Sequence, residues 1–201
     1  MIYLLRHGEL KGTEKKRFIG QTDLPLSEKG CQQALKWRDE LAFVPFKKIY
    51  CSRLVRSEAT ARLIADRKSE LVEIHPQLRE INLGKWDGLV MSDIRQRYPQ
   101  EWKERGEKID TFCPPGGESF SDLYQRVIPA YEEIASETDG NILIVGHAGV
   151  NRMILCHVLG MPIINLFRVT QDYGALNLIN HKTIPAQVVK LNATRDLLSS
   201  S

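Results

Sequence analysis

The sequence predicts a three-layer α/β/α sandwich with a mostly parallel central sheet. The main observation is that short apolar, strand-like runs alternate along the chain with amphipathic helical patterns, the order that places helices on both faces of a parallel sheet. The length of 201 residues and the near-average composition, 42% apolar and 26% charged, suit one globular domain. No repeat, low-complexity segment or linker divides the chain before the serines at 199–201. A single domain over residues 1–201 is therefore expected.

The first half of the chain contributes three expected strands with helices between them. Residues 2–5 are apolar and predict a buried strand. Ser27 is a suitable N-cap for the amphipathic helix that follows it. The segments 48–51 and 71–74 predict the second and third strands, and a helix that includes residues 59–64 lies between them.

A long polar stretch separates these elements from the second half. Residues 76–118 predict short helices and end in a Pro-Pro-Gly-Gly turn at 114–117. Ser119 can then cap a long amphipathic helix, in which Pro129 is the candidate site of a kink.

The second half contains the clearest core strand, at residues 141–145. It leads into a helix that includes residues 150–158, which Gly160 and Pro162 are expected to end. Two closing strands are expected at 176–179 and 187–191.

Charge and hydropathy exclude several classes of protein. The net charge of +3 is mixed along the chain, and the densest basic run, residues 11–17, contains a glutamate, which favours a solvated loop over a nucleic-acid groove. No apolar stretch reaches the roughly 18 residues of a membrane span, and residues 1–5 are too few for a signal peptide. We therefore expect a cytoplasmic protein that binds neither nucleic acid nor membranes.

The cysteines point to free thiols in a reducing compartment. Four are present, at positions 31, 51, 113 and 156, and none forms a Cys-x-x-Cys pair. The spacing therefore indicates neither a zinc site nor a redox pair.

Chemically active residues follow the predicted strands. In open parallel sheets, ligands bind at the carboxyl ends of the strands, where helix N-termini also point. The residues at these positions are Arg6, His7, Gly8 and Glu9 after the first strand, Arg53 and Arg56 after the second, Arg79 and Glu80 after the third, and His147, Ala148 and Gly149 after the fourth. We expect them to gather at one edge of the sheet.

Such a set of side chains suits phosphoryl transfer. A neutral imidazole such as His7 is a good nucleophile toward phosphorus, and a backbone carbonyl can hold its other nitrogen. Arginines bind phosphate and neutralise its charge. A partly buried carboxylic acid protonates the leaving oxygen, a role open to Glu80, Glu73 or Asp87. Glycine beside a histidine, such as Gly8, lets backbone N–H groups approach the anion. No metal or cofactor is required.

These segments resemble the histidine phosphatase superfamily, also called the phosphoglycerate mutase-like family, over nearly the whole chain. The matching segments are LRHGE at 5–9, RFIGQTDLPLS at 17–27, SRLVRS at 52–57, LREINLG at 78–84 and His147. The resemblance implies a phosphoglycerate mutase-like fold and a metal-independent phosphomonoesterase.

The resemblance also implies a role for each catalytic residue. His7 attacks phosphorus and becomes a phosphohistidine, Glu80 donates a proton to the leaving group, and water then hydrolyses the intermediate. Arg6, Arg56 and His147 hold the phosphoryl oxygens, so that the second phosphate arginine is Arg56 and not Arg53.

Further contacts with the substrate are implied for Thr13, Gly20, Gln21, Ala148 and Gly149. Thr13 is a departure from the family pattern, because many members carry an asparagine six residues after the nucleophile; its hydroxyl is still a donor. Trp86 and Tyr173 are candidates either for stacking on a base or sugar of the substrate or for core or hinge packing.

The branch motifs at 21–26, 115–119 and 171–177 look most like bacterial α-ribazole phosphatases, so we expect a small phosphorylated metabolite such as α-ribazole 5′-phosphate. Mutases of this family are typically longer, which favours hydrolysis.

A phosphoglycerate mutase, a broad-specificity sugar-phosphate or protein phosphatase, and a phosphate-ligand binding module remain alternatives. A serine hydrolase or nucleotide fold is disfavoured because Gly-x-Ser-x-Gly, Gly-x-Gly-x-x-Gly and Walker A motifs are absent. The oligomeric state stays open between a monomer and a homodimer paired through a closing strand.

Overall fold

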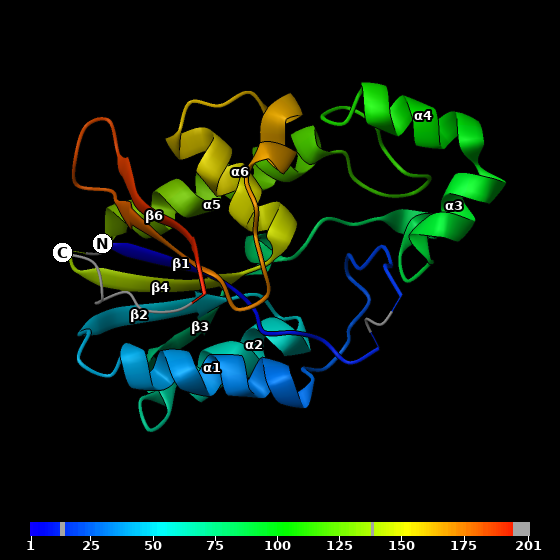
Figure 1. Ribbon diagram of the computed structural model, residues 1–201. Coiled ribbons are helices and arrows are strands. Elements are labelled where there is room, and N and C mark those ends of the chain that lie inside the picture. Colours follow the sequence, from blue (N-terminus) through cyan, green and yellow to red (C-terminus); the bar gives the residue numbers. More distant parts are fainter. Residues whose placement is uncertain (13–14, 138, 195–201) are drawn as a thin grey trace.

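The computed structural model describes residues 1–12, 15–137 and 139–194. Its six strands form one sheet in the order β3-β2-β4-β1-β5-β6 (Figure 1). They are β1 (Ile2–Arg6), β2 (Phe46–Cys51), β3 (Val72–Ile74), β4 (Asn141–Gly146), β5 (Leu176–Asn180) and β6 (Gln187–Ala193). The first four strands of that order are parallel, whereas β5 is antiparallel to β1 and β6 is antiparallel to β5. The predicted mostly parallel sheet is confirmed.

Helices cover both faces of this sheet, which confirms the three-layer architecture (Figure 1). The α-helices are α1 (Glu28–Glu40), α2 (Val55–Ala65), α3 (Met91–Arg97), α4 (Pro99–Glu107), α5 (Phe120–Glu137) and α6 (Ala148–Val158). Helices α1 and α2 pack together on one face, and α5 and α6 pack together on the other. The short helices α3 and α4 lie apart from both layers, as the polar stretch that contains them suggested. No helix of the described residues is long and apolar enough to cross a membrane.

Local capping explains where two of the long helices begin. The Ser27 hydroxyl accepts the N–H of Gly30 at 3.0 Å, and the Ser119 hydroxyl accepts the N–H of Asp122 at 3.1 Å. Both serines therefore satisfy an N–H group that a helix start leaves without a partner, as predicted. Helix α5 continues through Pro129 as one element, so the candidate kink does not divide it.

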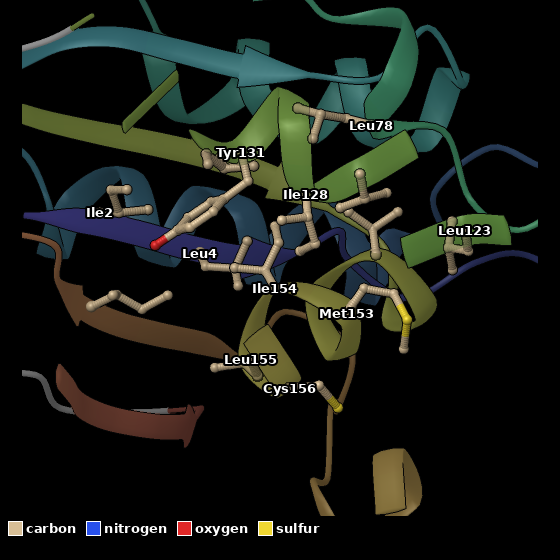
Figure 2. Packing of buried hydrophobic residues seen from close by; sticks show 14 of the residues in the cluster. Ile2, Leu4, Leu78, Leu123, Ile128, Tyr131, Met153, Ile154, Leu155 and Cys156 are labelled. Carbon is tan, nitrogen blue, oxygen red and sulfur yellow. The ribbon is translucent and has the colours of Figure 1, made fainter. Parts of the chain in front are cut away.

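The main core lies between the sheet and the α5–α6 layer. Leu4 of β1 and Leu123, Tyr131 and Ile154 of the two helices are buried members of one cluster, and Figure 2 shows Tyr131 and Ile154 close to Leu4. A second cluster fills the other face of the sheet, where Trp37 of α1 is buried. Because β4 faces both clusters, its residues 142–145 are fully buried, which confirms it as the central strand.

A third, smaller cluster holds α3 and α4 in place. Phe18, Trp86 and Ile94 are its buried members, and the ring of Trp102 lies 6.2 Å from that of Phe18. Trp86 is only 2% exposed, because it packs between Phe18 and Phe112. The stacking role suggested for Trp86 is therefore wrong: it is a core residue of this lobe.

Candidate active site

The two histidines meet at one edge of the sheet. Strand β1 ends at Arg6 and β4 at Gly146, and these two residues are register partners in neighbouring parallel strands. The next residues, His7 and His147, are therefore brought side by side, with ring centroids 5.1 Å apart. The expected gathering of residues at the carboxyl ends of the strands is what the structure shows.

His7 is held in its neutral form. Its Nδ1 lies 2.8 Å from the carbonyl oxygen of Gly8, which accepts the Nδ1 proton and leaves Nε2 with a free lone pair. Burial, together with the positive charges of Arg6 and Arg56, holds the pKa of His7 well below its ordinary value of 6.5. The ring is therefore unprotonated at neutral pH, as nucleophilic attack requires.

The structure corrects the expected role of Gly8. Its N–H donates to the Thr60 hydroxyl at 3.2 Å, so it is not directed at an anion. A Cβ at this position would lie 2.3 Å from the carbonyl oxygen of Gly30 in α1. Glycine is needed here because the β1 end and helix α1 approach each other closely.

His147 is buried behind Arg56 and Ser52. Its Nε2 lies 2.7 Å from the Ser52 hydroxyl, and its Nδ1 accepts the Nε–H of Arg56 at 3.3 Å. Burial lowers the pKa of His147 well below 6.5, and the charges of Arg56 and Arg6 lower it further. A neutral ring with Nδ1 as acceptor carries its proton on Nε2, so Ser52 accepts that proton and fixes the ring.

The arginine beside the histidines in helix α2 is Arg56, which is 1% exposed, whereas Arg53 is exposed. The Arg56 guanidinium donates to the backbone carbonyls of Gly20 and Thr22, the latter at 2.8 Å. Arg6 donates to the carbonyl of Gln171 at 2.6 Å. Both side chains are thus fixed by carbonyl oxygens and keep their full positive charge for a bound phosphate.

The loop that holds Arg56 is itself organised by Asp87. The Asp87 carboxylate accepts the N–H groups of Gly20, Gln21 and Thr22 at 2.9, 2.7 and 2.9 Å. Gln21 also donates through its side chain to the backbone carbonyl of Glu80 at 3.1 Å. Gly20 and Gln21 therefore contact Arg56 and Glu80, and Asp87 serves as the anchor of the loop. Thr13 lies outside the described residues.

Glu80 is the carboxylate that reaches the site. It is 6% exposed, and its two oxygens accept the N–H groups of Ile81 at 2.9 Å and Gly149 at 3.0 Å. Glu73, in contrast, forms a surface ion pair with Lys48 at 2.6 Å. Asp87 is held by three backbone N–H groups, so Glu80 is the one of the three candidate acids that lines the cavity at this site.

The position of the Glu80 carboxylate depends on the absence of a side chain at Gly149. A Cβ on Gly149 would lie 2.4 Å from Glu80 Oε1, which forces the carboxylate to move. We expect Gly149→Ala to lower kcat/KM for an alkyl phosphate by 10- to 100-fold, since a displacement of about 1 Å can cost 10²-fold. Steady-state assays of the purified variant measure this loss.

Gly106→Ala provides the matched control, because a Cβ there meets no atom within 4 Å. We expect it to keep wild-type activity. Equal activity of both variants and wild type would show that Glu80 does not depend on Gly149 for its position.

A cavity of about 220 Å³ opens at this edge of the sheet. Arg6, Glu80, Ala148, Gly149 and Tyr173 are among its lining residues. Of the four predicted substrate contacts that the structure describes, Ala148 and Gly149 line the cavity, and Gly20 and Gln21 do not. His7 is 3% exposed and is not itself a lining residue. It lies beside Tyr173, which lines the cavity and whose ring is 5.6 Å from the imidazole and 3.7 Å from the Arg6 guanidinium carbon. The described part of the chain brings together no group of three or more metal-ligating side chains.

Sequence reasoning missed a buried amide network that supports Arg6. Gln171, whose carbonyl binds Arg6, exchanges hydrogen bonds with the side chain of Asn177 at 2.9 and 3.0 Å. Asn177 in turn donates to the carbonyl of Leu4 in β1 at 3.0 Å. The clue in the sequence was Asn177, a polar residue among apolar neighbours in the predicted strand at 176–179.

The comparisons with known proteins agree with this geometry. The model of the histidine phosphatase superfamily (branch 1) matches residues 2–194. The chain is 29% identical to the adenosylcobalamin/alpha-ribazole phosphatase of Escherichia coli strain K12, with 96% of each covered. It is also 29% identical to phosphoserine phosphatase 1 of Hydrogenobacter thermophilus, covering 96% of this chain and 92% of that one. The crystal structure of the alpha-ribazole phosphatase from Shigella flexneri matches with a TM-score of 0.88 at 28% identity, over 96% of each chain. The chain therefore belongs to the histidine phosphatase superfamily.

Proposed function

We propose that this protein is a metal-independent phosphomonoesterase that works through a phosphohistidine intermediate on a small phosphorylated metabolite. The observation that supports this most directly is the state of His7: neutral, fixed at Nδ1 by the Gly8 carbonyl, and flanked by the charges of Arg6 and Arg56. A binding module has no use for a nucleophile held in this way, nor for a buried acid such as Glu80 beside it.

The chemistry proceeds in two displacements. The Nε2 lone pair of His7 attacks phosphorus, the ester P–O bond breaks, and Glu80 transfers its proton to the leaving oxygen. Water then attacks the phosphohistidine, Glu80 takes a proton from that water, and inorganic phosphate leaves with His7 restored. Arg6 and Arg56 neutralise the phosphoryl oxygens in both steps.

The identity of the substrate is a separate question. Two relatives of equal identity carry different printed names, one for α-ribazole and one for phosphoserine. α-Ribazole 5′-phosphate remains the first substrate to assay because the branch motifs favour it. A phosphoglycerate mutase would use the same first step, and it is recognised by forming 2-phosphoglycerate from 3-phosphoglycerate without releasing phosphate.

Trapping the intermediate tests the proposal. We expect millisecond mixing with ³²P-labelled 4-nitrophenyl phosphate, followed by a base quench, to leave up to one label per chain on His7, lost on brief acid treatment as a phosphoramidate is. The label is mapped by mass spectrometry of the digested protein. Turnover without any labelled protein, or an acid-stable label on a serine, would contradict the phosphohistidine mechanism.

A further inference from the structure

The part of the cavity beyond the phosphate site is apolar and aromatic. Its wall includes Phe18, Phe112, Phe120 and Phe167, from segments far apart in the sequence. A cavity lined in this way and holding about 150 Å³ already accommodates a benzene ring, so about 220 Å³ admits a ring together with its phosphate. The leaving alcohol of the substrate therefore has room for a flat apolar group.

Four arginines line the cavity, and one of them differs from the rest. Arg6, Arg17 and Arg152 donate to backbone carbonyls, whereas Arg105 has no hydrogen bond or ion pair with the described residues. Arg105 of α4 reaches the cavity, and its guanidinium carbon lies 5.3, 5.8 and 5.7 Å from the ring centroids of Phe18, Trp102 and Phe167. Its contacts with the described residues are these aromatic faces, and none is with a carboxylate. Burial lowers the pKa of Arg105, and no neighbouring acid opposes that effect.

Four acids on helix α4 and in the cavity wall are held by other groups. On its own helix, Glu104 and Glu107 form surface ion pairs with Lys108 at 3.3 Å and Lys103 at 3.7 Å. In the cavity wall, Glu118 is bound by Arg126 at 2.8 Å, and Glu80 accepts two backbone N–H groups. Arg105 is thus a half-buried charge held in place by rings and left open toward the cavity.

A cation in such surroundings gains most from an anion that arrives with the ligand. Desolvation makes an unpaired buried charge costly, and a guanidinium fixed on aromatic faces is already oriented for a carboxylate or phosphate. In the function proposed above, the phosphoryl group is held by Arg6, another lining residue of this cavity. A second anionic group on the same substrate is what remains for Arg105.

Resting on the phosphatase function above, we propose that the substrate is a phosphomonoester whose alcohol carries a flat apolar group and a second anionic group, carboxylate or phosphate, that pairs with Arg105. This substrate class differs from α-ribazole 5′-phosphate, whose alcohol is uncharged. Both are phosphate monoesters, but the proposed substrate also carries an anionic group that Arg105 of α4 binds.

The test compares three aryl phosphates whose para substituent ends in a carboxylate, a phosphonate or a primary amide, each joined through two methylene groups. The methylenes keep the leaving phenols nearly equal in acidity, so a difference in kcat/KM reports on recognition. We expect wild type to prefer at least one anionic ester over the amide by about 10-fold or more, and the preferred ester identifies the anion.

Variants assign the preference to Arg105. We expect Arg105→Gln to lower the ratio of anionic ester to amide at least 5-fold and Arg105→Lys to retain most of it. Lys103→Gln, which removes an exposed charge from the same helix, is the matched control and keeps the wild-type ratio. Thermal unfolding checks that each variant is folded.

The possible failures are distinguishable. Equal hydrolysis of all three esters by wild type, or a ratio unchanged in Arg105→Gln, overturns the role of Arg105 and leaves the phosphatase function standing. If none of the three esters is hydrolysed, the phosphatase function is overturned, and the inference about Arg105 with it.

Discussion

Replacing His7 by alanine is expected to lower kcat for 4-nitrophenyl phosphate by at least about 10⁴-fold. The substitution removes the free Nε2 lone pair of His7. The unprotonated Nδ1 of His147 already accepts the Nε–H of Arg56, and neither Arg6 nor Arg56 can attack phosphorus. Water could still react with a bound ester, but it would lack the preorganised lone pair that Nε2 provides. Release of 4-nitrophenol, followed spectrophotometrically over hours, measures the residual rate.

The same experiment needs a control for folding and for contaminating phosphatase. His157, on the outer part of α6, contacts Tyr124 at 2.9 Å and lies away from the cavity wall, so His157→Ala is expected to keep wild-type kcat. His7→Ala is expected to stay folded because His7 makes a single side-chain hydrogen bond. Undiminished hydrolysis by His7→Ala would show that another group is the nucleophile.

Much of the fold follows from local patterns in the sequence. The apolar run at β4, the serine caps of α1 and α5, and the stop at Gly160, whose φ is +59°, are each readable within a few residues. The meeting of His7 and His147 is also predictable, because parallel neighbouring strands bring residues that follow their ends to the same edge. These predictions succeed because each depends on backbone periodicity or on a cap that one side chain supplies.

The parts that could not be predicted depend on contacts between distant segments. Asp87 and Glu80 are both acidic and both lie in the loop after β3, and only the folded loop shows that Asp87 accepts N–H groups from residues 20–22. Gly8 looked like an anion-binding glycine, yet its lack of a Cβ is required by Gly30 in α1. Arg105 gave no signal at all, since its aromatic neighbours come from three separate segments.

Glu80→Gln is expected to lower kcat/KM for an alkyl phosphate by 10²- to 10⁴-fold, the range that general acid catalysis usually contributes. The glutamine amide keeps the size of the side chain but cannot release a proton to the leaving oxygen. Both oxygens of the Glu80 carboxylate accept an N–H group, from Ile81 and from Gly149, and the amide NH₂ cannot accept one. Part of the loss is therefore expected to come from displacement of the side chain. A measurement on one substrate would not separate these two effects.

The dependence on the leaving group separates them. A 4-nitrophenolate departs without a proton, so Glu80→Gln is expected to cost at least 10-fold less with 4-nitrophenyl phosphate than with an alkyl phosphate. The comparison uses kcat/KM because that quantity reports transfer to His7 and is insensitive to the later hydrolysis of the phosphohistidine. Loss by the same factor for both substrates would assign Glu80 a purely structural role. A steeper dependence on leaving-group acidity than in wild type assigns the proton to Glu80, since displacement of the carboxylate alone does not distinguish one leaving oxygen from another.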